Sequence, residues 1–351
     1  MPATVRPFPT DVAKTKTASL QRIPHGGNLD DARSRFPNAP TPWIDLSTGI
    51  NPAAYPIGTI PNEAWTRLPT AEDEHALLDA ARQSYAVSAD TSIVAAPGTQ
   101  ALIQTVVRLF PAPTDVAILS PTYSEHAHCW HNEGHHVRNV QHLTEIGSAR
   151  VVVCVNPNNP TGEITKADAL HRLAETLHRR NGLLMIDEAF ADATPDMSLA
   201  GRLPPSTIIL RSFGKFFGLA GLRLGFAICQ PATADQLTSM LGPWAVSGPA
   251  ICIGRQALTD IAWQDHTRDR LHRDCQRLRK LLTINNLTPQ GDCPLFQLTT
   301  HQAAASAAAH LGQHGIHTRA FTDQPGRLRF GLPGNDEAWD RLANALAAHK
   351  T

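Results

Sequence analysis

The chain has 351 residues, of which 42% are hydrophobic, and its 31 Lys and Arg residues balance 31 Asp and Glu residues. This length allows a large hydrophobic core and two domains. The balanced charge argues against a nucleic-acid-binding surface, and no stretch reaches the apolar length of a membrane span, so neither nucleic acid nor a membrane is expected as a partner.

The six cysteines are scattered along the chain and form no C-x-x-C pair. Several stand in apolar stretches, which predicts buried thiols in a reducing compartment and therefore a cytoplasmic protein. Residues 1–21 carry charges and prolines but lack the apolar centre of a signal peptide, and we interpret them as a mobile tail.

Residues 22–70 form the next segment, which contains HGGN at 25–28 and IDLSTGINP at 44–52. IDLST predicts a short strand that ends in a turn. The two glycines beside His25 indicate a flexible joint, or alternatively a place where the backbone approaches a small anion. The joint is the simpler interpretation.

From residue 71 to residue 245, apolar strands alternate with helical patterns. Helices are expected over 71–87, where acidic residues suit the start of a helix, and over about 166–180. Buried strands are expected in SIVAAP, DVAILSP, RVVVCVNP, NGLLMIDEAF, STIILRSF and RLGFAIC. This alternation predicts an α/β fold, with a mostly parallel sheet flanked by helices in a large domain.

Residues 246–351 show a different pattern. One or two long Arg-rich helices are expected over 251–284, followed by a strand near LFQLTT and an alanine-rich helix at 301–313. A strand in RLRFGLP and a last helix from about residue 335 follow. We therefore expect a smaller α+β domain beside the large one.

Polar residues at the carboxyl ends of parallel strands converge on one crevice, so they are candidates for a common site. Gly98, Thr99 and Gln100 open a helix whose N–H groups suit a phosphate, although an ordinary N-cap by Thr99 explains the same residues. Tyr123 offers a flat ring for stacking, and taken alone it is only an aromatic residue in a turn.

Asp187 and Glu188 end an apolar strand, so at least one of the carboxylates is partly buried and needs a partner. That partner is an arginine in the simpler interpretation, or the protonated ring nitrogen of a cofactor in the functional one. The string NPNNPTG at 156–162 is rarer than a generic turn. Its Asn159 is suited to hydrogen-bond a phenolate oxygen on a ring.

The stretch LRSFGKFFGLAGLRLG at 210–225 holds Lys215 in a glycine-rich loop after a buried strand. A lysine desolvated there loses basicity and can attack a carbonyl as a neutral amine. Ser212 and Arg223 flank it as donors for a phosphate. Phosphate donors, a stacking ring, an acid, an amide and an amine at successive strand ends together describe a site for pyridoxal 5'-phosphate.

The motifs NPNNPTG, LMIDEAF and SFGKFFGLAGLRLG closely resemble those of fold-type-I pyridoxal-phosphate enzymes of the class I/II aminotransferase group, and the resemblance runs from about residue 22 to the C-terminus. It implies that Lys215 forms the Schiff base with the cofactor, Asp187 pairs with the pyridine nitrogen and Tyr123 stacks on the ring. Asn159 would meet the phenolate oxygen. The cofactor phosphate would be held by Thr99, Ser212 and Arg223, with Gly98 and Gln100 in the same binding loop.

The resemblance also implies substrate contacts. Arg329 in RLRFGLP matches the arginine that binds the substrate α-carboxylate, and Arg319 in GIHTRAF matches one that contacts a substrate phosphate. Further contacts would come from the N-terminal segment, residues 22–70, which closes over the active site: His25, Gly26 and Asn51, with Asn159 beside them.

Two positions depart from the pattern of the group. Relatives often carry a tyrosine three residues after the aspartate, where this chain has Phe190, so Asn159 would act alone on the phenolate oxygen. Relatives also often show Tyr-Pro where this chain has Leu68–Pro69. That tyrosine reaches the cofactor phosphate of the partner subunit, and its hydroxyl is missing here.

Within the group, HGGN followed by IDLSTGINP is most similar to the L-threonine-O-3-phosphate decarboxylases of cobalamin biosynthesis. The resemblance implies a small phosphorylated amino-acid substrate and decarboxylation of L-threonine O-3-phosphate to (R)-1-amino-2-propanol O-2-phosphate. It also implies a homodimer and leaves room for contacts with other cobalamin-pathway enzymes. The alternatives are a histidinol-phosphate-type aminotransferase and a non-catalytic member of the pathway that binds a partner.

Overall fold

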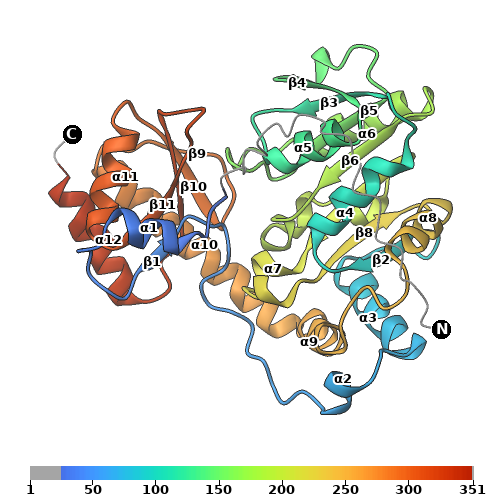
Figure 1. Cartoon of the computed structure of the whole chain (residues 1–351), viewed down its shortest axis with the longest axis horizontal. Helices are drawn as coiled ribbons and strands as arrows, with labels where there is room; N and C mark the ends of the chain where they lie inside the picture. The colour runs from blue at the N-terminus through green and yellow to red at the C-terminus, as the bar shows by residue number, and fades with distance from the viewer. Residues whose placement is uncertain (1–24, 350–351) are drawn as a thin grey trace, which may run out of the picture.

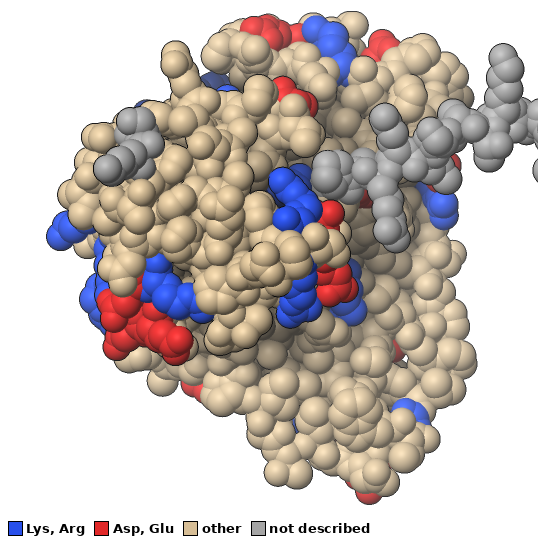
Figure 2. Space-filling model, turned by 60° about the vertical axis from the view of Figure 1, so that its left-hand side comes forward, with Lys and Arg blue, Asp and Glu red and all other residues tan. Residues whose placement is uncertain are grey.

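The computed structural model describes residues 25–349, which form a larger and a smaller part joined by a long helix (Figure 1). The interpretation of residues 1–21 as a mobile tail lies outside this range. No helix within 25–349 is long and apolar enough to cross a membrane. On the face that Figure 2 displays, charged side chains gather in a few groups of both signs and leave broad uncharged areas between them.

The larger part is built on a seven-stranded sheet in the order β2-β8-β7-β6-β5-β3-β4. Its strands are β2 (Ser92–Ala96), β3 (Asp115–Leu119), β4 (His136–Val140), β5 (Val151–Val155), β6 (Leu183–Asp187), β7 (Thr207–Ser212) and β8 (Gly225–Cys229). Only β8 runs antiparallel to its neighbours, and the other pairs are parallel. The predicted α/β fold with a mostly parallel sheet is confirmed.

Helices cover both faces of this sheet, which explains why its inner strands are apolar throughout. In β5, Val151 and Val153 face one hydrophobic cluster, whereas Val152 and Cys154 face the other. The first cluster includes side chains of α4 (Thr99–Val106), α5 (Ser124–Asn132) and α8 (Pro231–Leu241). The second includes side chains of α3 (Ala71–Ser84), α6 (Ala167–His178) and α9 (Gly248–Thr259).

The sequence did not predict β4, the edge strand that reads HVRNV. Three of its five side chains are exposed, so it lacks the apolar run that marks the inner strands. The helix or helices expected over 251–284 are two, α9 and α10 (Ile261–Ile284). Asp260 separates them and caps the second helix by accepting a hydrogen bond from the backbone N–H of Trp263.

The smaller part holds a five-stranded sheet in the order β1-β11-β12-β10-β9. Its strands are β1 (Ile44–Leu46), β9 (Pro289–Gln290), β10 (Phe296–Thr300), β11 (Ile316–Ala320) and β12 (Arg327–Gly331). The remaining helices are α1 (Leu29–Arg35), α2 (Glu63–Thr66), α7 (Phe213–Phe216), α11 (Ala304–Gln313) and α12 (Asp336–Ala348). Strand β1 pairs parallel to β11, so the N-terminal segment completes the smaller sheet.

Helix α9 packs on α3 of the larger part, and α10 runs from there to the smaller sheet (Figure 1). The expected domain limits at residues 70 and 245 stay a prediction.

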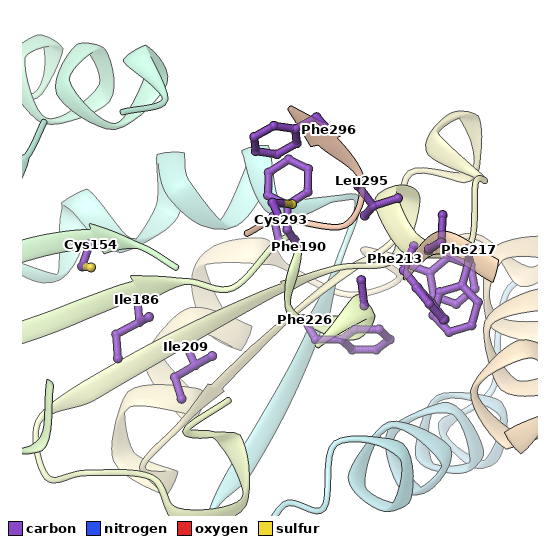
Figure 3. Packing of buried hydrophobic residues seen from close by; sticks show 14 of the residues in the cluster. Cys154, Ile186, Phe190, Ile209, Phe213, Phe217, Phe226, Cys293, Leu295 and Phe296 are labelled. Carbon is purple, nitrogen blue, oxygen red and sulfur yellow. The ribbon is translucent and has the colours of Figure 1, made fainter. Parts of the chain in front are cut away.

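The two parts meet at a seam where Phe190, after β6, and Phe296 of β10 pack edge to face, with ring centroids 5.1 Å apart (Figure 3). A Cβ on Gly49 would come within 2.8 Å of both rings, so only glycine allows the N-terminal segment to pass there.

Candidate active site

A cavity of about 150 Å³ lies beyond the carboxyl ends of β5, β6 and β7. It is lined by all of the residues that the sequence indicated for a cofactor, namely Gly98, Thr99, Gln100, Tyr123, Asn159, Asp187, Ser212, Lys215 and Arg223. A second cavity of about 490 Å³ adjoins it and shares Tyr123, Asn159, Phe190 and Lys215. The site therefore has a smaller and a larger compartment with Lys215 between them.

One end of the smaller cavity is built to accept an anion. Helix α4 starts directly after Gly98, which has a φ of 85°, and no side chain of the described residues caps its first turn. The N–H groups of that turn are thus available to a phosphate. A Cβ on Gly98 would lie 2.7 Å from Nη2 of Arg223, and one on Gly225 would lie 2.7 Å from the backbone N of Thr99. Glycines are needed at both positions because the helix start and the guanidinium approach the turn so closely.

The other end of this cavity carries the carboxylate of Asp187. Its Oδ2 lies 3.0 Å from Nε2 of His126, and its Oδ1 accepts a hydrogen bond of 3.0 Å from the backbone N–H of Ala189. His126 is fully buried and Asp187 is 4% exposed. These two contacts hold the carboxylate in one orientation, in a cavity where a protonated ring nitrogen could pair with it.

The neighbouring carboxylate, Glu188, points to the other side of the strand and is bound by Arg211 at 2.9 Å. Arg211 also pairs with Asp192, and all three side chains are buried. Glu188 further accepts a hydrogen bond of 3.0 Å from the backbone N–H of Leu199. The interpretation as an ion pair with an arginine thus holds for Glu188. Asp187 lines the cavity, and its pairing with a cofactor ring nitrogen stays a prediction.

Lys215 lies in α7, a single turn of helix that follows β7. Burial lowers the pKa of Lys215 from 10.5 to about 8, and the positive charge of Arg329 adds to this effect. Asp187 acts in the opposite direction. Much of the amine is therefore neutral near pH 8, and the neutral amine is the form that attacks a carbonyl.

Arg329 and Asn159 are hydrogen-bonded where the two cavities meet. Arg329 donates through Nη1 to Oδ1 of Asn159 and through Nη2 to the backbone carbonyl of Ser47, the latter at 2.7 Å. Its Nε has no hydrogen-bond partner within residues 25–349. Burial lowers the pKa of Arg329 to about 10, so the guanidinium stays charged at neutral pH.

The larger cavity is also lined by His25, Gly26 and Arg319. Arg319 lies on β11, with its guanidinium 5.2 Å from the ring centroid of Phe321. The cavity thus gathers Arg319 and Arg329 from the smaller part and Lys215 from the larger part. A small ligand with two anionic groups fits such a lining.

Glu125 and His126 are site residues that the sequence reasoning missed. Glu125 lies 3.0 Å from Nε2 of His25 through Oε1 and accepts a hydrogen bond of 2.8 Å from Nε2 of Gln100 through Oε2. The hydroxyl of Tyr123 in turn donates to Oε1 of Gln100 at 3.3 Å. The only signal in the sequence was an acid and a histidine that follow Tyr123 after one serine, in SPTYSEH.

Asn51 lies outside the lining of both cavities. It is 1% exposed, and its side chain is bonded to the backbone carbonyl of Phe216 and to Arg270. A direct contact of Asn51 with a substrate stays a prediction.

The two positions that depart from the pattern of the group lie in different surroundings. Phe190 is buried in the seam, and Leu68 is 60% exposed.

The donor set can be tested against pyridoxal phosphate. The N–H groups and the guanidinium at one end of the smaller cavity match a phosphate, and the buried carboxylate at the other end matches a protonated pyridine nitrogen. The tyrosine ring on the wall matches a flat ring, and the amine of lowered pKa matches an aldehyde. Fold and site together define a pyridoxal-phosphate enzyme of fold type I.

Comparison with known proteins names the family. The chain belongs to the aminotransferase class I and II family, whose model matches residues 65–346. A Pseudomonas aeruginosa protein named threonine-phosphate decarboxylase is 42% identical to it over 332 residues, which cover 93% of this chain and 98% of that protein. A protein of the same name from Sinorhizobium sp. is 38% identical over 331 residues, with the same coverage of 93% and 98%.

Solved structures agree on the fold. A histidinol-phosphate aminotransferase from Sinorhizobium meliloti, solved in complex with pyridoxal-5'-phosphate, has a TM-score of 0.78 to this chain and covers 96% of it. The match also covers 97% of that protein, at 20% sequence identity. At that sequence identity, the likeness shows that the two proteins share a fold. The substrate has to be inferred from other observations.

Proposed function

We propose that this enzyme uses pyridoxal 5'-phosphate to decarboxylate L-threonine O-3-phosphate to (R)-1-amino-2-propanol O-2-phosphate, a step of cobalamin biosynthesis. The near full-length likeness to two proteins named threonine-phosphate decarboxylase carries the choice of reaction. The pair Arg319 and Arg329 on the wall of the larger cavity supports the choice of substrate, since it matches a ligand with a carboxylate and a phosphate.

The reaction breaks the bond between Cα and the carboxylate, releases CO₂ and places one proton on Cα. When bound, the cofactor supplies an electron sink for the electron pair of the broken bond. The protein has to hold the substrate so that this particular bond breaks, and it has to deliver the proton to the right carbon atom.

Arg329 holds the substrate carboxylate in this proposal. It is buried, and two of its nitrogens are bound to Asn159 and to the backbone of Ser47, so its position is set before the substrate arrives. Its unpartnered Nε keeps a donor for the incoming carboxylate. A rigid, charged donor of this kind orients its ligand better than a mobile side chain.

Arg319 receives the substrate phosphate, and His25 lines the same compartment. Lys215 lies on the boundary of both compartments and is the amine whose pKa of about 8 lets it take up and return a proton near neutral pH. Asp187, held by its contact with His126, is the residue that would pair with the ring nitrogen of the bound cofactor. These roles assign each charged group of the site to one part of the reaction.

The test is an incubation of the purified, cofactor-loaded protein with threonine phosphate in the absence of 2-oxoglutarate. We expect release of CO₂ in stoichiometric amounts with the amino-propanol phosphate, and none from Lys215→Ala or with unphosphorylated threonine at the same concentration. Nitrogen transfer to 2-oxoglutarate without CO₂ would instead identify a histidinol-phosphate-type aminotransferase. A protein that takes up no cofactor, as judged by absorbance, would be the non-catalytic, partner-binding member.

We also propose a homodimer. Trp65 and Leu68, in and beside α2, are 64% and 60% exposed, and Trp244 on a neighbouring turn is 53% exposed. The segment that carries α2 projects from the edge of the larger part (Figure 1). Exposed aromatic and aliphatic side chains in such numbers mark an interface. Analytical ultracentrifugation should show a dimer that Trp65→Glu weakens, and a monomeric wild-type protein would contradict the proposal.

The cytoplasm is the proposed location, because all six cysteines are present as thiols and five of them are buried. Contacts with other enzymes of the cobalamin pathway stay a prediction. A pull-down with the purified pathway enzymes, using a Trp65→Glu variant as control for the exposed face, would test them.

A further inference from the structure

We propose that Arg270 of helix α10 is a positioning residue for Lys215 and acts on it through the side chain of Asn51. The inference rests on the proposed role of Lys215 as the cofactor-binding amine. It assigns a role to Arg270 and Asn51, which line neither the cofactor cavity nor the substrate cavity.

The backbone of the lysine turn needs partners from elsewhere in the chain. Helix α7 is only four residues long, so its carbonyl groups find few N–H donors within the helix. From the same turn, the carbonyl of Lys215 accepts a hydrogen bond of 3.3 Å from the N–H of Gly218. Here Asn51 donates its backbone N–H to the carbonyl of Lys215 at 2.9 Å and its Nδ2 to the carbonyl of Phe216 at 2.8 Å. Tyr55 donates its N–H to the carbonyl of Phe217 at 2.8 Å. Three consecutive carbonyl groups at the lysine are thus bound by residues 51–55.

Arg270 determines which way the amide of Asn51 points. Its Nη2 donates to Oδ1 of Asn51 at 2.6 Å, and the backbone N–H of Ala53 donates to the same oxygen at 3.0 Å. With two donors on the oxygen, the NH₂ group is left to face the carbonyl of Phe216. Asn51 is 1% exposed, so water cannot easily replace a lost donor.

The contact between the two segments is tight. Gly218, at the end of the lysine turn, has a φ of 68°, and a Cβ there would lie 2.7 Å from the carbonyl oxygen of Asn51 and 2.7 Å from Cα of Ala54. Arg270 is itself held by Asp274, one helical turn along α10, at 3.2 Å. Because α10 continues into the smaller part, a chain of short contacts links that helix to the lysine backbone.

Loss of the guanidinium leaves Oδ1 of Asn51 with one donor and so weakens the hold on the orientation of the amide. The lysine turn can then shift by a fraction of an ångström. Displacements of about 1 Å in an active site cost up to roughly a hundred-fold in rate, so we expect a smaller but clear effect, a fall in kcat of about ten-fold. The KM should change by less than about two-fold, because Arg319 and Arg329 are untouched.

The experiment compares four forms of the cofactor-loaded protein, namely wild type, Arg270→Met, Arg270→Lys and the control Arg273→Met, which changes an exposed arginine on the same helix. The readouts are kcat and KM for CO₂ release, and the midpoint of a pH titration of the cofactor absorbance. We expect Arg270→Met to shift that midpoint away from the wild-type value. Arg270→Lys should have a midpoint close to that of wild type, and Arg273→Met should match wild type. A midpoint and kcat in Arg270→Met equal to those of wild type would overturn the inference.

Two further measurements separate this inference from the proposed function. Borohydride reduction followed by mass spectrometry should place the cofactor on Lys215 in wild type, and a label elsewhere would overturn the proposed role of Lys215 itself. If Arg270→Met does not fold, Asn51→Asp takes its place, since it keeps the size of the side chain but cannot donate to Phe216. An unshifted midpoint in folded Asn51→Asp would count against the inference in the same way.

Discussion

Arg329 donates a hydrogen bond to Oδ1 of Asn159 and so connects the residue proposed for the substrate carboxylate with the residue proposed for the cofactor ring. Because its oxygen is used in this way, Asn159 offers its NH₂ group to other ligands. A donor is what a phenolate oxygen requires. The two proposed halves of the site therefore share one amide, and we expect a change at Asn159 to affect both.

Substitutions of Asn159 test this connection. Asn159→Ala leaves Nη1 of Arg329 without its acceptor and removes the donor as well, and we expect kcat/KM for CO₂ release to fall about ten- to a hundred-fold. Asn159→Asp keeps an acceptor for Arg329, so its KM should stay near that of wild type while the cofactor absorbance changes. Equal KM values in both variants would show that the bond to Arg329 does not matter for substrate binding.

The lowered pKa of Lys215 predicts a cost to stability. The folded-state pKa of about 8 lies below the ordinary 10.5, so between these values the unfolded chain binds more protons, and the free energy of unfolding rises with pH. Below pH 8, burial of the charged amine destabilises the cofactor-free protein. We expect Lys215→Met to be more stable than wild type at pH 7, by on the order of 1–2 kcal/mol, with the gap closing towards pH 10.5.

Thermal unfolding of the cofactor-free proteins at pH 7 and pH 9.5 measures this difference. A wild-type protein that is the more stable of the two at pH 7 would mean that Asp187 outweighs the burial of the amine.

His126 should act on the cofactor through Asp187. His126→Phe fills the same buried space but removes the hydrogen bond of 3.0 Å to Oδ2, so the carboxylate can rotate away from the ring nitrogen. Hydrogen bonds to charged groups contribute about 1.5–3 kcal/mol, and we expect cofactor affinity to fall about ten-fold or more. Equilibrium dialysis with pyridoxal phosphate measures it. His128→Phe, on the same helix, is the control and should bind as wild type does.

Arg211 should matter for stability and leave the chemistry of the site alone. Arg211→Met places the buried carboxylates of Glu188 and Asp192 side by side without their cation. Removing one partner of a buried ion pair costs about 3–5 kcal/mol. Urea unfolding of the cofactor-free variant should show this loss, whereas Arg172→Met, at an exposed position of α6, should change stability by less than about 0.5 kcal/mol. Equal stabilities would show that the ion pair makes no net contribution.

Several features of the fold could be predicted because they depend on neighbouring residues. The apolar runs predicted the inner strands β5, β6 and β7, and acidic or capping residues marked the starts of helices such as α3. Strand β4 could not be found in this way, since an edge strand with exposed side chains has no apolar run. The parallel pairing of β1 with β11 was equally out of reach, because it joins segments separated by most of the chain.

The sequence by itself determined the class of this enzyme, because Gly98, Asn159, Asp187 and Lys215 stand at successive strand ends, and parallel strands bring such ends together whatever the details of packing. Tertiary structure alone decided how the neighbours of these residues are used. In the folded chain, Asp187 lines the cavity and contacts His126, whereas Glu188 pairs with Arg211. Asn51 is hydrogen-bonded to the lysine turn. Those choices depend on long-range contacts, whose partners no local pattern of residues specifies.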